Sequence, residues 1–458
     1  MSSTGTLHFV GIGGIGMSAI ARILMARGES VTGSDVAESP LLDELRTLGA
    51  TISVGHDMKN VNGARAVVVS SAIDSENPEY RHAAERGIPI VRRGEMLRRI
   101  MDGRSGIAIC GTHGKTTTTA MAATILRRCD IDASLVLGGI DVNTGTNAHE
   151  GSAPWFLTEA DESDGSFSLL EPTIAVVTNI ENDHLSSDAE LPKLIASFDH
   201  FLGRLPENGV AIVGVDNPQS QSIAASRRAA RTVTFGIAED ADVRASNIRF
   251  ADLGSSFDVI AGGACLGTVQ LGVPGAINIE NALAAIAVAR AMELPFVRIA
   301  QALSTFRGVR RRFEILAKTP RMIVVDDYAH HPTAVRATIA AARGYHRGPI
   351  VVAFQPHRYT RTAYLAAAFS DALRGADQVY LAPIYAASEP AIDGISERTI
   401  GDPLQASGTP VHYVKYVHDL RTVLQEQAPD NALVLMLGAG NITKAAKELA
   451  SDVTGATV

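Results

Sequence analysis

Short apolar runs, each followed by a turn and a helical pattern, recur along this 458-residue chain. Near the N-terminus an apolar run at 7–10 leads into a glycine-rich segment and then an apolar stretch that ends at Gly28. Further strand-like runs follow at 31–35 and 64–73. Strands that alternate with helices on this scale are typical of a parallel sheet. We therefore predict an α/β unit at the N-terminus.

The same pattern begins twice more. A second unit opens with a strand at 106–110 that runs into a glycine turn and a helix rich in Thr and Ala. The expected later elements of this unit are strands at 155–160, 173–180 and 209–215 and a helix at 278–294. In the third unit four strands are expected, at 321–330, 348–357, 376–385 and 431–440. Residues 90–104 predict a basic amphipathic helix that crosses into the second unit.

The predicted fold class is α/β with three domains, in agreement with roughly 150 residues per domain. We place a Rossmann-like domain at 1–104 and a central P-loop ATPase-like domain with a mostly parallel sheet at 105–313. A second Rossmann-like domain is expected at 314–458.

Composition narrows the class of protein. With 46% hydrophobic and 20% charged residues the chain is globular, and a net charge of -8 argues against nucleic acid as a partner. No apolar run reaches membrane-spanning length, and glycines and Arg22 interrupt the apolar N-terminus, so we expect neither a membrane span nor a signal peptide. Three scattered cysteines support no disulfide framework or zinc site. A cytoplasmic protein is expected.

The strongest chemical signal follows the strand at 106–110. It is a phosphate-loop candidate with the residues Gly111, Thr112, His113, Gly114, Lys115, Thr116 and Thr117. Glycines leave backbone N–H groups open to a phosphate, the lysine would meet the β- and γ-phosphates of ATP, and a hydroxyl can bind Mg²⁺. The spacing is tighter than G-x-x-x-x-G-K-[ST]. Strand, Gly-Lys-Thr-Thr and helix together favour an ATP site over an ordinary turn.

A second glycine loop lies at Gly11, Gly13, Gly14 and Gly16, with Asp35 at the end of the next strand. Alone, this G-x-G-x-x-G pattern would suggest NAD. Its chemistry requires only a diphosphate at a helix N-terminus and a carboxylate beyond it, which a UDP-sugar also satisfies. A stronger phosphate loop elsewhere in the chain favours the nucleotide sugar.

Acidic residues follow two apolar strands of the second unit. Glu159 opens one group, and residues 179–184 form the other, which ends at His184. The carboxyl ends of parallel strands share one edge of a sheet, where carboxylates can hold Mg²⁺ between phosphates. Each group taken singly is more often a solvated loop, but their position after strands favours a site.

The third unit has polar strand ends of its own. His330 and the neighbouring His331 follow one strand, but adjacent residues on a turn point apart, so substrate recognition is favoured over a metal site. Arg358 and Arg361 follow the next strand, at a spacing that suits a carboxylate or phosphate. Three arginines at 310–312 are either a solvated hinge or groups that reach ATP.

Read together, these motifs resemble the Mur ligase family over essentially the whole chain. They are GIGGIGMSAIA, GTHGKTTT, EADESD, TNIENDH, NIENALAA, GVRRRFE, DDYAHHP and QPHRYTRT, in the expected order. The resemblance implies that ATP phosphorylates the lactyl carboxylate of UDP-N-acetylmuramate. The amine of L-alanine then attacks the acyl phosphate, in peptidoglycan precursor synthesis. The implied partners are these two substrates, and the implied cofactors are ATP and Mg²⁺.

The resemblance also implies roles for individual residues. The implied catalytic residues are Lys115, His184, Arg358 and Arg361, and the implied metal ligands are Thr116, Glu159 and His184. Contacts with ATP are implied for the phosphate loop at residues 111–117. Asn278 and Asn281 are implied to face the adenine, and Arg312 and Asp327 to contact ATP from the domain junction and the third domain. The amino-acid pocket is implied to comprise Tyr328, His330, Arg358 and Arg361. The UDP diphosphate is implied to lie on Gly11, Gly13, Gly14 and Gly16, with Asp35 and Ser71 nearby.

Departures from the family pattern are few. Ile277 replaces the usual His before the adenine-facing segment, and Asn441 replaces a frequent Asp. Sibling ligases that add later residues use a carbamylated lysine in this region, whereas residues 194–200 of this chain contain no lysine. This absence agrees with the alanine-adding branch.

Three alternatives remain open. The nearest is the recycling ligase of the same family, which attaches a whole tripeptide. An NAD-dependent dehydrogenase would explain the first glycine loop but not the second. A non-catalytic nucleotide-sensing module would leave the polar strand ends of the third domain without a function.

Overall fold

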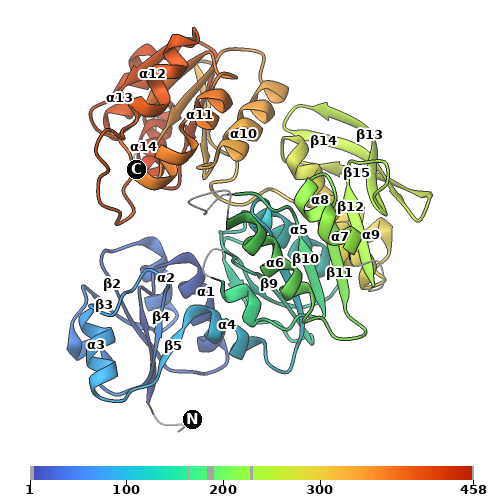
Figure 1. Cartoon of the computed structure of the whole chain (residues 1–458), viewed down its shortest axis with the longest axis vertical. Coiled ribbons are helices and arrows are strands. Elements are labelled where there is room, and N and C mark those ends of the chain that lie inside the picture. Colours follow the sequence, from blue (N-terminus) through green and yellow to red (C-terminus); the bar gives the residue numbers. More distant parts are fainter. Residues whose placement is uncertain (1–4, 163–164, 183–189, 227–230, 456–458) are drawn as a thin grey trace. The chain divides into compact units, whose positions relative to one another are not determined.

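The computed structural model describes residues 5–162, 165–182, 190–226 and 231–455 (Figure 1). The chain divides into two units. The first contains Met1–Ile180, Leu194–Val243 and Ala284–Ala302. The second contains Glu181–Lys193, Arg244–Leu283 and Leu303–Val458. The domain boundaries at 104/105 and 313/314 remain predictions.

A parallel sheet with the order β3-β2-β1-β4-β5 begins the first unit. Its strands are β1 (Thr6–Val10), β2 (Val31–Asp35), β3 (Thr51–Val54), β4 (Ala64–Val69) and β5 (Ile90–Arg92). Its helices are α1 (Ile15–Ala26), α2 (Pro40–Thr47), η1 (Met58–Val61), α3 (Pro78–Glu85) and α4 (Arg93–Met101). The strands predicted at 7–10, 31–35 and 64–73 are confirmed as β1, β2 and β4.

The predicted helix at 90–104 is wrong at both ends. Its first residues form β5, which pairs with β4, and the helix α4 begins only at Arg93 and ends at Met101. A three-residue edge strand is too short to show a period of two. The helical pattern of the residues that follow therefore extended the prediction back over the strand.

A buried polar network ties β1, β2 and α3 together. The carboxylate of Glu79, fully buried, accepts from Ser34 Oγ at 2.6 Å and from Asn60 Nδ2 at 2.6 Å, and it lies 3.4 Å from His8 Nε2. Burial would raise the pKa of Glu79, but hydrogen bonds from His8 and Ser34 bring it below its ordinary value. The Glu79 carboxylate is therefore ionised in the folded protein at neutral pH.

Glu79→Gln is expected to destabilise the protein by about 1–3 kcal/mol near neutral pH, because it leaves buried donors badly paired. A carboxylate whose pKa is lowered by folding stabilises the protein above its unfolded pKa of about 4.3, and this stability is lost as the pH falls through the folded pKa. Denaturant unfolding between pH 7 and pH 3 should thus show the difference between wild type and variant shrinking in acid. A difference that stays constant would contradict this account.

The central sheet of the first unit has the order β12-β11-β10-β6-β9-β7-β8. Its strands are β6 (Ser105–Cys110), β7 (Ser134–Val136), β8 (Ala148–His149), β9 (Trp155–Glu159), β10 (Ile174–Val177), β11 (Val210–Gly214) and β12 (Thr232–Gly236). Its helical elements are α5 (Lys115–Arg128), η2 (Ser166–Leu169), α6 (Leu191–Leu202) and α7 (Pro218–Ser226). The pairs are parallel except the β7/β8 hairpin, so the predicted mostly parallel sheet is confirmed.

The second unit contains an antiparallel segment that sequence reasoning missed. Its strands are β13 (Val243–Ala251), β14 (Gly254–Ala261) and β15 (Ala264–Leu271). Strands β14 and β15 form an antiparallel hairpin across Gly262 and Gly263, both with positive φ. The helices α8 (Ala276–Ala291) and α9 (Phe296–Ser304) follow in the chain, and α8 corresponds to the predicted helix at 278–294.

The C-terminal sheet has the order β16-β17-β21-β18-β19-β20. Its strands are β16 (Glu314–Lys318), β17 (Met322–Asp327), β18 (Ile350–Phe354), β19 (Gln378–Leu381), β20 (Val411–Tyr413) and β21 (Ala432–Leu437). Its helices are α10 (Pro332–Tyr345), α11 (Tyr359–Leu373), α12 (Arg398–Ala406), α13 (Asp419–Gln427) and α14 (Ile442–Thr454). The four predicted strands are confirmed as β17, β18, β19 and β21, and the edge strands β16 and β20 were missed.

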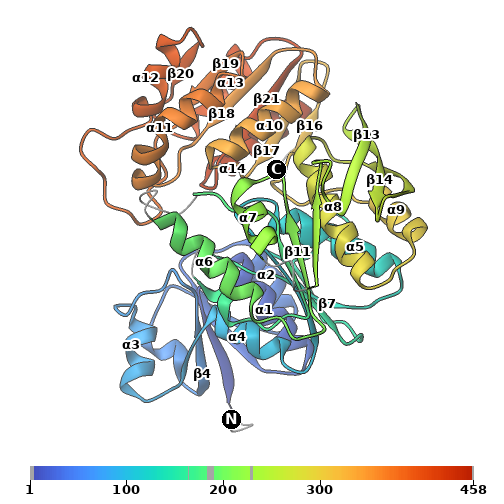
Figure 2. The same cartoon turned by 45° about the vertical axis from the view of Figure 1, so that its right-hand side comes forward.

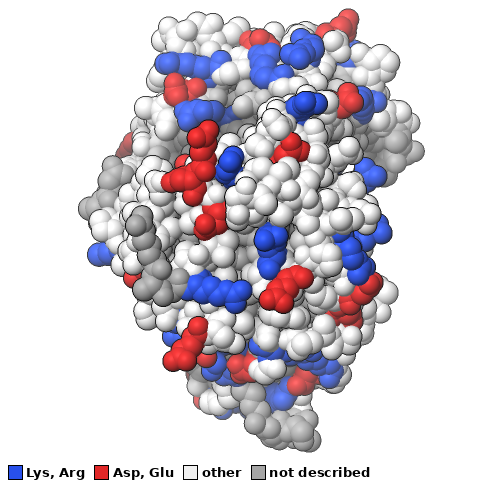
Figure 3. All heavy atoms as spheres, turned by 90° about the vertical axis from the view of Figure 1, so that its right-hand side faces the viewer, with Lys and Arg blue, Asp and Glu red and all other residues white. Residues whose placement is uncertain are grey.

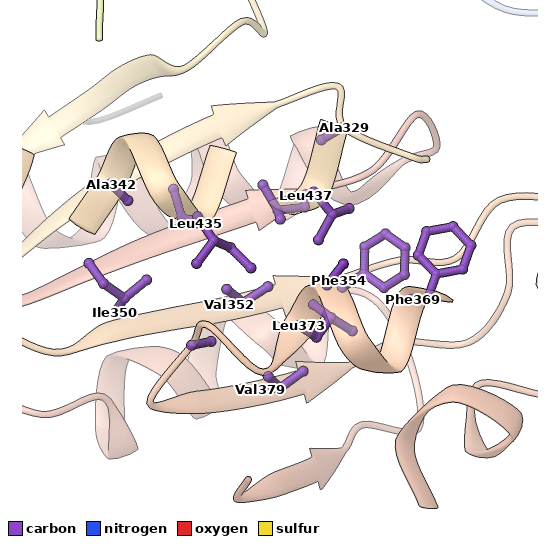
Figure 4. Close-up of a cluster of buried hydrophobic side chains, with 14 of the residues drawn as sticks. Ala329, Ala342, Ile350, Val352, Phe354, Phe369, Leu373, Val379, Leu435 and Leu437 are labelled. Atoms are coloured by element: carbon purple, nitrogen blue, oxygen red, sulfur yellow. The ribbon is translucent and has the colours of Figure 1, made fainter. Parts of the chain in front are cut away.

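Helices cover both faces of this sheet (Figure 2), with a layer of buried apolar residues under each set of helices. One layer holds α10, α11 and α12, and includes Phe354, Phe369, Leu373 and Leu435 (Figure 4). The other layer packs α13 and α14 against the opposite side of the strands. With both faces covered, β18 and β21 are buried along their whole length, which explains their continuous apolar sequences.

The surface carries charges of both signs. On the face shown in Figure 3, lysine and arginine side chains are interspersed with aspartate and glutamate. In the part of the chain that the structure describes, no helix is both long and apolar enough for a membrane span.

Candidate active site

The predicted phosphate loop connects β6 to α5 at the carboxyl edge of the central sheet. Gly111 has φ +125° and Gly114 has φ +87°, conformations that glycine adopts without strain. Gly114 is the N-cap of α5, and no side chain caps this helix. The first backbone N–H groups of α5 thus face the loop with the positive end of the helix dipole, as a phosphate site requires.

Residues that follow β10 hold this loop in shape. His113 N donates to Asn179 Oδ1 at 2.8 Å, and Asn179 Nδ2 donates back to His113 O at 3.1 Å. Thr178 Oγ1 donates to His113 O at 2.7 Å. Sequence reasoning missed this function of Thr178 and Asn179, although their position directly after an apolar strand was the available signal.

Gly111 leaves no room for a side chain. A Cβ at this position would lie 2.1 Å from Thr178 Oγ1 and 2.9 Å from Asn179 O. Gly111→Ala is therefore expected to weaken ATP binding at least about tenfold, because the loop must move to relieve the overlap.

Gly145→Ala is the matched control for this prediction. Gly145 also has positive φ, at +70°, but nothing lies within 4 Å of its Cβ position. This variant should lose only the backbone contribution of about 1 kcal/mol in stability and keep ATP affinity. Calorimetric titration with ATP tests both, and equal ATP affinity in the two variants would contradict the steric argument.

Lys115 is held in the phosphate loop by a buried carboxylate. Its Nζ lies 2.7 Å from Glu162 Oε2 and donates to Gly111 O at 2.5 Å. Burial alone would lower the pKa of the Lys115 ammonium, but the carboxylates of Glu162 and Asp161 raise it above its ordinary value. Burial in turn raises the pKa of Glu162, against the attraction of Lys115. Glu162 belongs to the predicted acidic group that begins at Glu159, but its contact with Lys115 was not predicted.

The predicted metal ligands Thr116 and Glu159 lie together. Thr116 Oγ1 donates to Glu159 Oε2 at 3.0 Å, and Gly138 N donates to Glu159 Oε1 at 2.6 Å. A hydroxyl and a carboxylate at the edge of a phosphate loop form the oxygen donor set that Mg²⁺ prefers. His184, the third predicted ligand, lies outside the described residues.

The N-terminal glycine loop begins where β1 ends. Gly13 N donates to Asp35 Oδ2 at 2.8 Å, and Val36 N donates to Asp35 Oδ1 at 2.8 Å, so this carboxylate fixes the loop against the end of β2. Helix α1 starts after Gly14 with no capping side chain and no acidic residue in its first turn. Ser71, the other predicted contact, is exposed after β4. A diphosphate contact of this loop stays a prediction.

In the second unit, Asp327 ends β17 and its carboxylate accepts two backbone N–H groups. The donors are Phe313 N and Ala329 N, both at 2.7 Å. Burial raises the pKa of Asp327, opposed by the positive charge of Arg312. The Arg312 guanidinium lies over the Tyr328 ring, 5.1 Å from its centroid. The contact of Asp327 and Arg312 with ATP stays a prediction.

The predicted amino-acid pocket residues lie close together at the ends of β17 and β18. His330 Nδ1 lies 2.8 Å from Tyr328 O, and the His330 ring lies 5.8 Å from the ring of His357. Arg361, buried in the first turn of α11, places Nη1 3.2 Å from His357 Nδ1. Arg358 is exposed at the N-cap of α11. His357 was missed as a site residue, although it directly precedes the predicted Arg358 in the sequence.

The predicted adenine contacts Asn278 and Asn281 lie on α8. Asn281 Nδ2 donates to Asn278 Oδ1 at 3.1 Å, and Asn278 Nδ2 donates to Pro274 O at 2.7 Å. The two amides are thus oriented before any ligand binds, and their contact with adenine stays a prediction.

A phosphate loop at the edge of a parallel sheet, beside a carboxylate paired with its threonine, defines an α/β nucleotide-binding enzyme. Three family models match the chain in order. They are described as Mur ligase family, catalytic domain (residues 6–105), Mur ligase middle domain (109–289) and Mur ligase, glutamate ligase domain (311–440). The chain belongs to the Mur ligase family.

Relatives extend over the whole length. A UDP-N-acetylmuramate–L-alanine ligase of Geotalea uraniireducens is 42% identical over 452 residues, 98% of each chain. One of Desulfosudis oleivorans is 43% identical over 447 residues, 97% of this chain and 98% of the relative. The crystal structure of a UDP-N-acetylmuramate-alanine ligase from Thermotoga maritima matches with a TM-score of 0.85 and 30% identity, over 98% of this chain and 99% of that one.

Proposed function

We propose that this chain catalyses the ATP-dependent joining of L-alanine to the lactyl carboxylate of UDP-N-acetylmuramate, in the cytoplasm, as a step of peptidoglycan precursor synthesis. The products are UDP-N-acetylmuramoyl-L-alanine, ADP and phosphate. The names of the full-length relatives support the reaction. The observation that carries the proposal is the partly buried ammonium of Lys115 in a phosphate loop whose helix has no side-chain cap, next to the Thr116–Glu159 pair.

The loop supplies fixed positive charge to the nucleotide. The backbone N–H groups at the start of α5 would bind phosphate oxygens, and Lys115 would stabilise the negative charge on the phosphoryl group that moves to the lactyl carboxylate. In this step a carboxylate oxygen forms a bond to the γ-phosphorus while the bond to ADP breaks. Because Asn179 and Thr178 fix the loop beforehand, little reorganisation accompanies the transfer.

Mg²⁺ fits the residues beside the loop. The hydroxyl of Thr116 and the carboxylate of Glu159 would hold it, with His184 as a further ligand of the family pattern. Bound there, the cation would neutralise charge on the phosphates. Glu159 is itself oriented by the backbone N–H of Gly138, so its position does not depend on a ligand.

The residues of the second unit would bind the amino acid. Arg358 and Arg361 offer guanidinium donors for the alanine carboxylate, and Tyr328 and His330 would form the wall beside its amine and methyl group. The amine attacks the acyl phosphate, its proton is released, and phosphate leaves from the tetrahedral intermediate. Selectivity against glycine or serine rests on one methyl or hydroxyl group and is worth only about 1–3 kcal/mol.

The choice of acceptor separates this proposal from tripeptide recycling. Phosphate release should be measured with ATP, Mg²⁺ and UDP-N-acetylmuramate, adding L-alanine, glycine, L-serine or the tripeptide in separate reactions. We expect the highest kcat/KM with L-alanine. A higher kcat/KM with the tripeptide would move the chain to the recycling branch.

A further inference from the structure

Arg93 lies beside the N-terminal glycine loop, although no sequence motif pointed to it. It is the first residue of α4 and directly follows β5, so it emerges at the carboxyl edge of the same parallel sheet as the loop after β1. Helices α1 and α4 pack against each other. The Arg93 Nη1 atom lies 3.3 Å from the position that a Cβ on Gly16 would occupy. The guanidinium therefore covers the first turn of α1.

Arg93 also forms an ion pair with the acidic loop after β9. The Arg93 Nη2 atom donates to Asp161 Oδ2 at 3.2 Å. Asp161 is two residues from Glu159 and adjacent to Glu162, the carboxylate that holds Lys115. One arginine thus contacts both the turn that carries the first glycine loop and the acidic loop beside the second.

We propose that Arg93 binds the diphosphate of the sugar nucleotide, and that Asp161 positions the guanidinium for this contact. The inference rests on the proposed function, because it takes the nucleotide sugar as the ligand of the first glycine loop. A planar guanidinium forms paired hydrogen bonds with phosphate oxygens, and α1 adds the positive end of its dipole at the same place. Neither a side-chain cap nor a first-turn carboxylate of α1 competes for that position.

The neighbouring arginine offers a matched control. Arg92 carries the same charge one residue earlier but is exposed, whereas the side chain of Arg93 is only 19% exposed. Replacing either one by alanine changes the net charge equally. A difference between Arg92→Ala and Arg93→Ala therefore reports contact with the ligand and not a change in the general field of the protein.

The test is calorimetric titration of the full chain with UDP and with uridine, in the absence of ATP. Arg93→Ala is expected to raise the Kd for UDP about 30-fold, Arg93→Lys to raise it less, and Arg92→Ala to leave it within about twofold. The Kd for uridine, which lacks phosphate, should be the same in all variants, as should the Kd for ATP.

Two results would overturn the proposal. One is unchanged UDP affinity in Arg93→Ala while the wild type binds UDP. The other is an equal loss for uridine and UDP, which would mean that Arg93 only supports the fold. A wild-type chain that binds no UDP would be a different outcome. It would contradict the nucleotide sugar as the ligand of the first glycine loop, and with it the proposed function on which the inference rests. The positioning by Asp161 predicts that Asp161→Asn weakens UDP binding in the wild type and has no further effect in Arg93→Ala.

Discussion

Lys115→Ala is expected to lower kcat by about a thousandfold or more, the largest effect of any substitution in the first unit. The lysine supplies a full positive charge in the loop, where its side chain is only 17% exposed, and its charge acts on the phosphoryl group during transfer. Its pKa is raised by Glu162 and Asp161 despite burial, so the ammonium stays protonated throughout the neutral range. Steady-state phosphate release with all three substrates measures the effect.

Arg128→Ala serves as the control, because it removes one exposed positive charge at the other end of the same helix. It should retain kcat within about twofold. Thermal unfolding of Lys115→Ala must show a folded protein for the comparison to hold. A folded Lys115→Ala variant with kcat near the wild-type value would contradict the assignment of the phosphate loop.

Arg361→Leu is expected to raise the KM for L-alanine about 100-fold while the KM for ATP changes little. Arg361 is buried in the first turn of α11, and its guanidinium is held near His357, so it is a preformed site for the amino-acid carboxylate. Loss of a charge-assisted hydrogen bond to a carboxylate costs about 1.5–3 kcal/mol. Leucine retains part of the side-chain volume, which limits the structural damage.

Arg374→Ala tests whether any arginine of this helix has the same effect. Arg374 is the C-cap of α11, and it lies 3.4 Å from Asp371 at the surface. It should leave the KM for L-alanine unchanged. If Arg361→Leu raised the KM for ATP and for L-alanine by the same factor, the amino-acid pocket would be assigned to the wrong residues.

The sequence predicted the buried parallel strands well, because such strands are apolar along their whole length. Strands β18 and β21 show this pattern, and each was expected close to its observed position. Short strands and half-buried strands lack it. Strand β20 has only three residues, and β14 is buried only at alternate positions, so polar residues break up its apolar sequence. Burial and packing against neighbouring strands, and not local propensity, decide such strands.

The site was predictable where a motif has its own chemistry, and less so where a residue acts through another. Lys115 and Thr116 belong to a recognisable phosphate loop, and Glu159 follows a strand in an acidic run. Glu162 differs from other acidic surface residues only by its contact with Lys115, which the fold creates. Arg93 likewise reaches its position through the packing of α1 and α4, and neither spacing nor composition contains that information.

The most direct test of the reaction uses UDP-N-acetylmuramate with ¹⁸O in its lactyl carboxylate, together with ATP, Mg²⁺ and L-alanine. If the carboxylate attacks the γ-phosphate and the alanine amine then displaces phosphate, the released phosphate carries one ¹⁸O atom. The sugar nucleotide then gains the mass of alanine less one water, with one labelled oxygen lost. We expect both results. Unlabelled phosphate, or phosphate release without the alanine adduct, would contradict the acyl-phosphate mechanism.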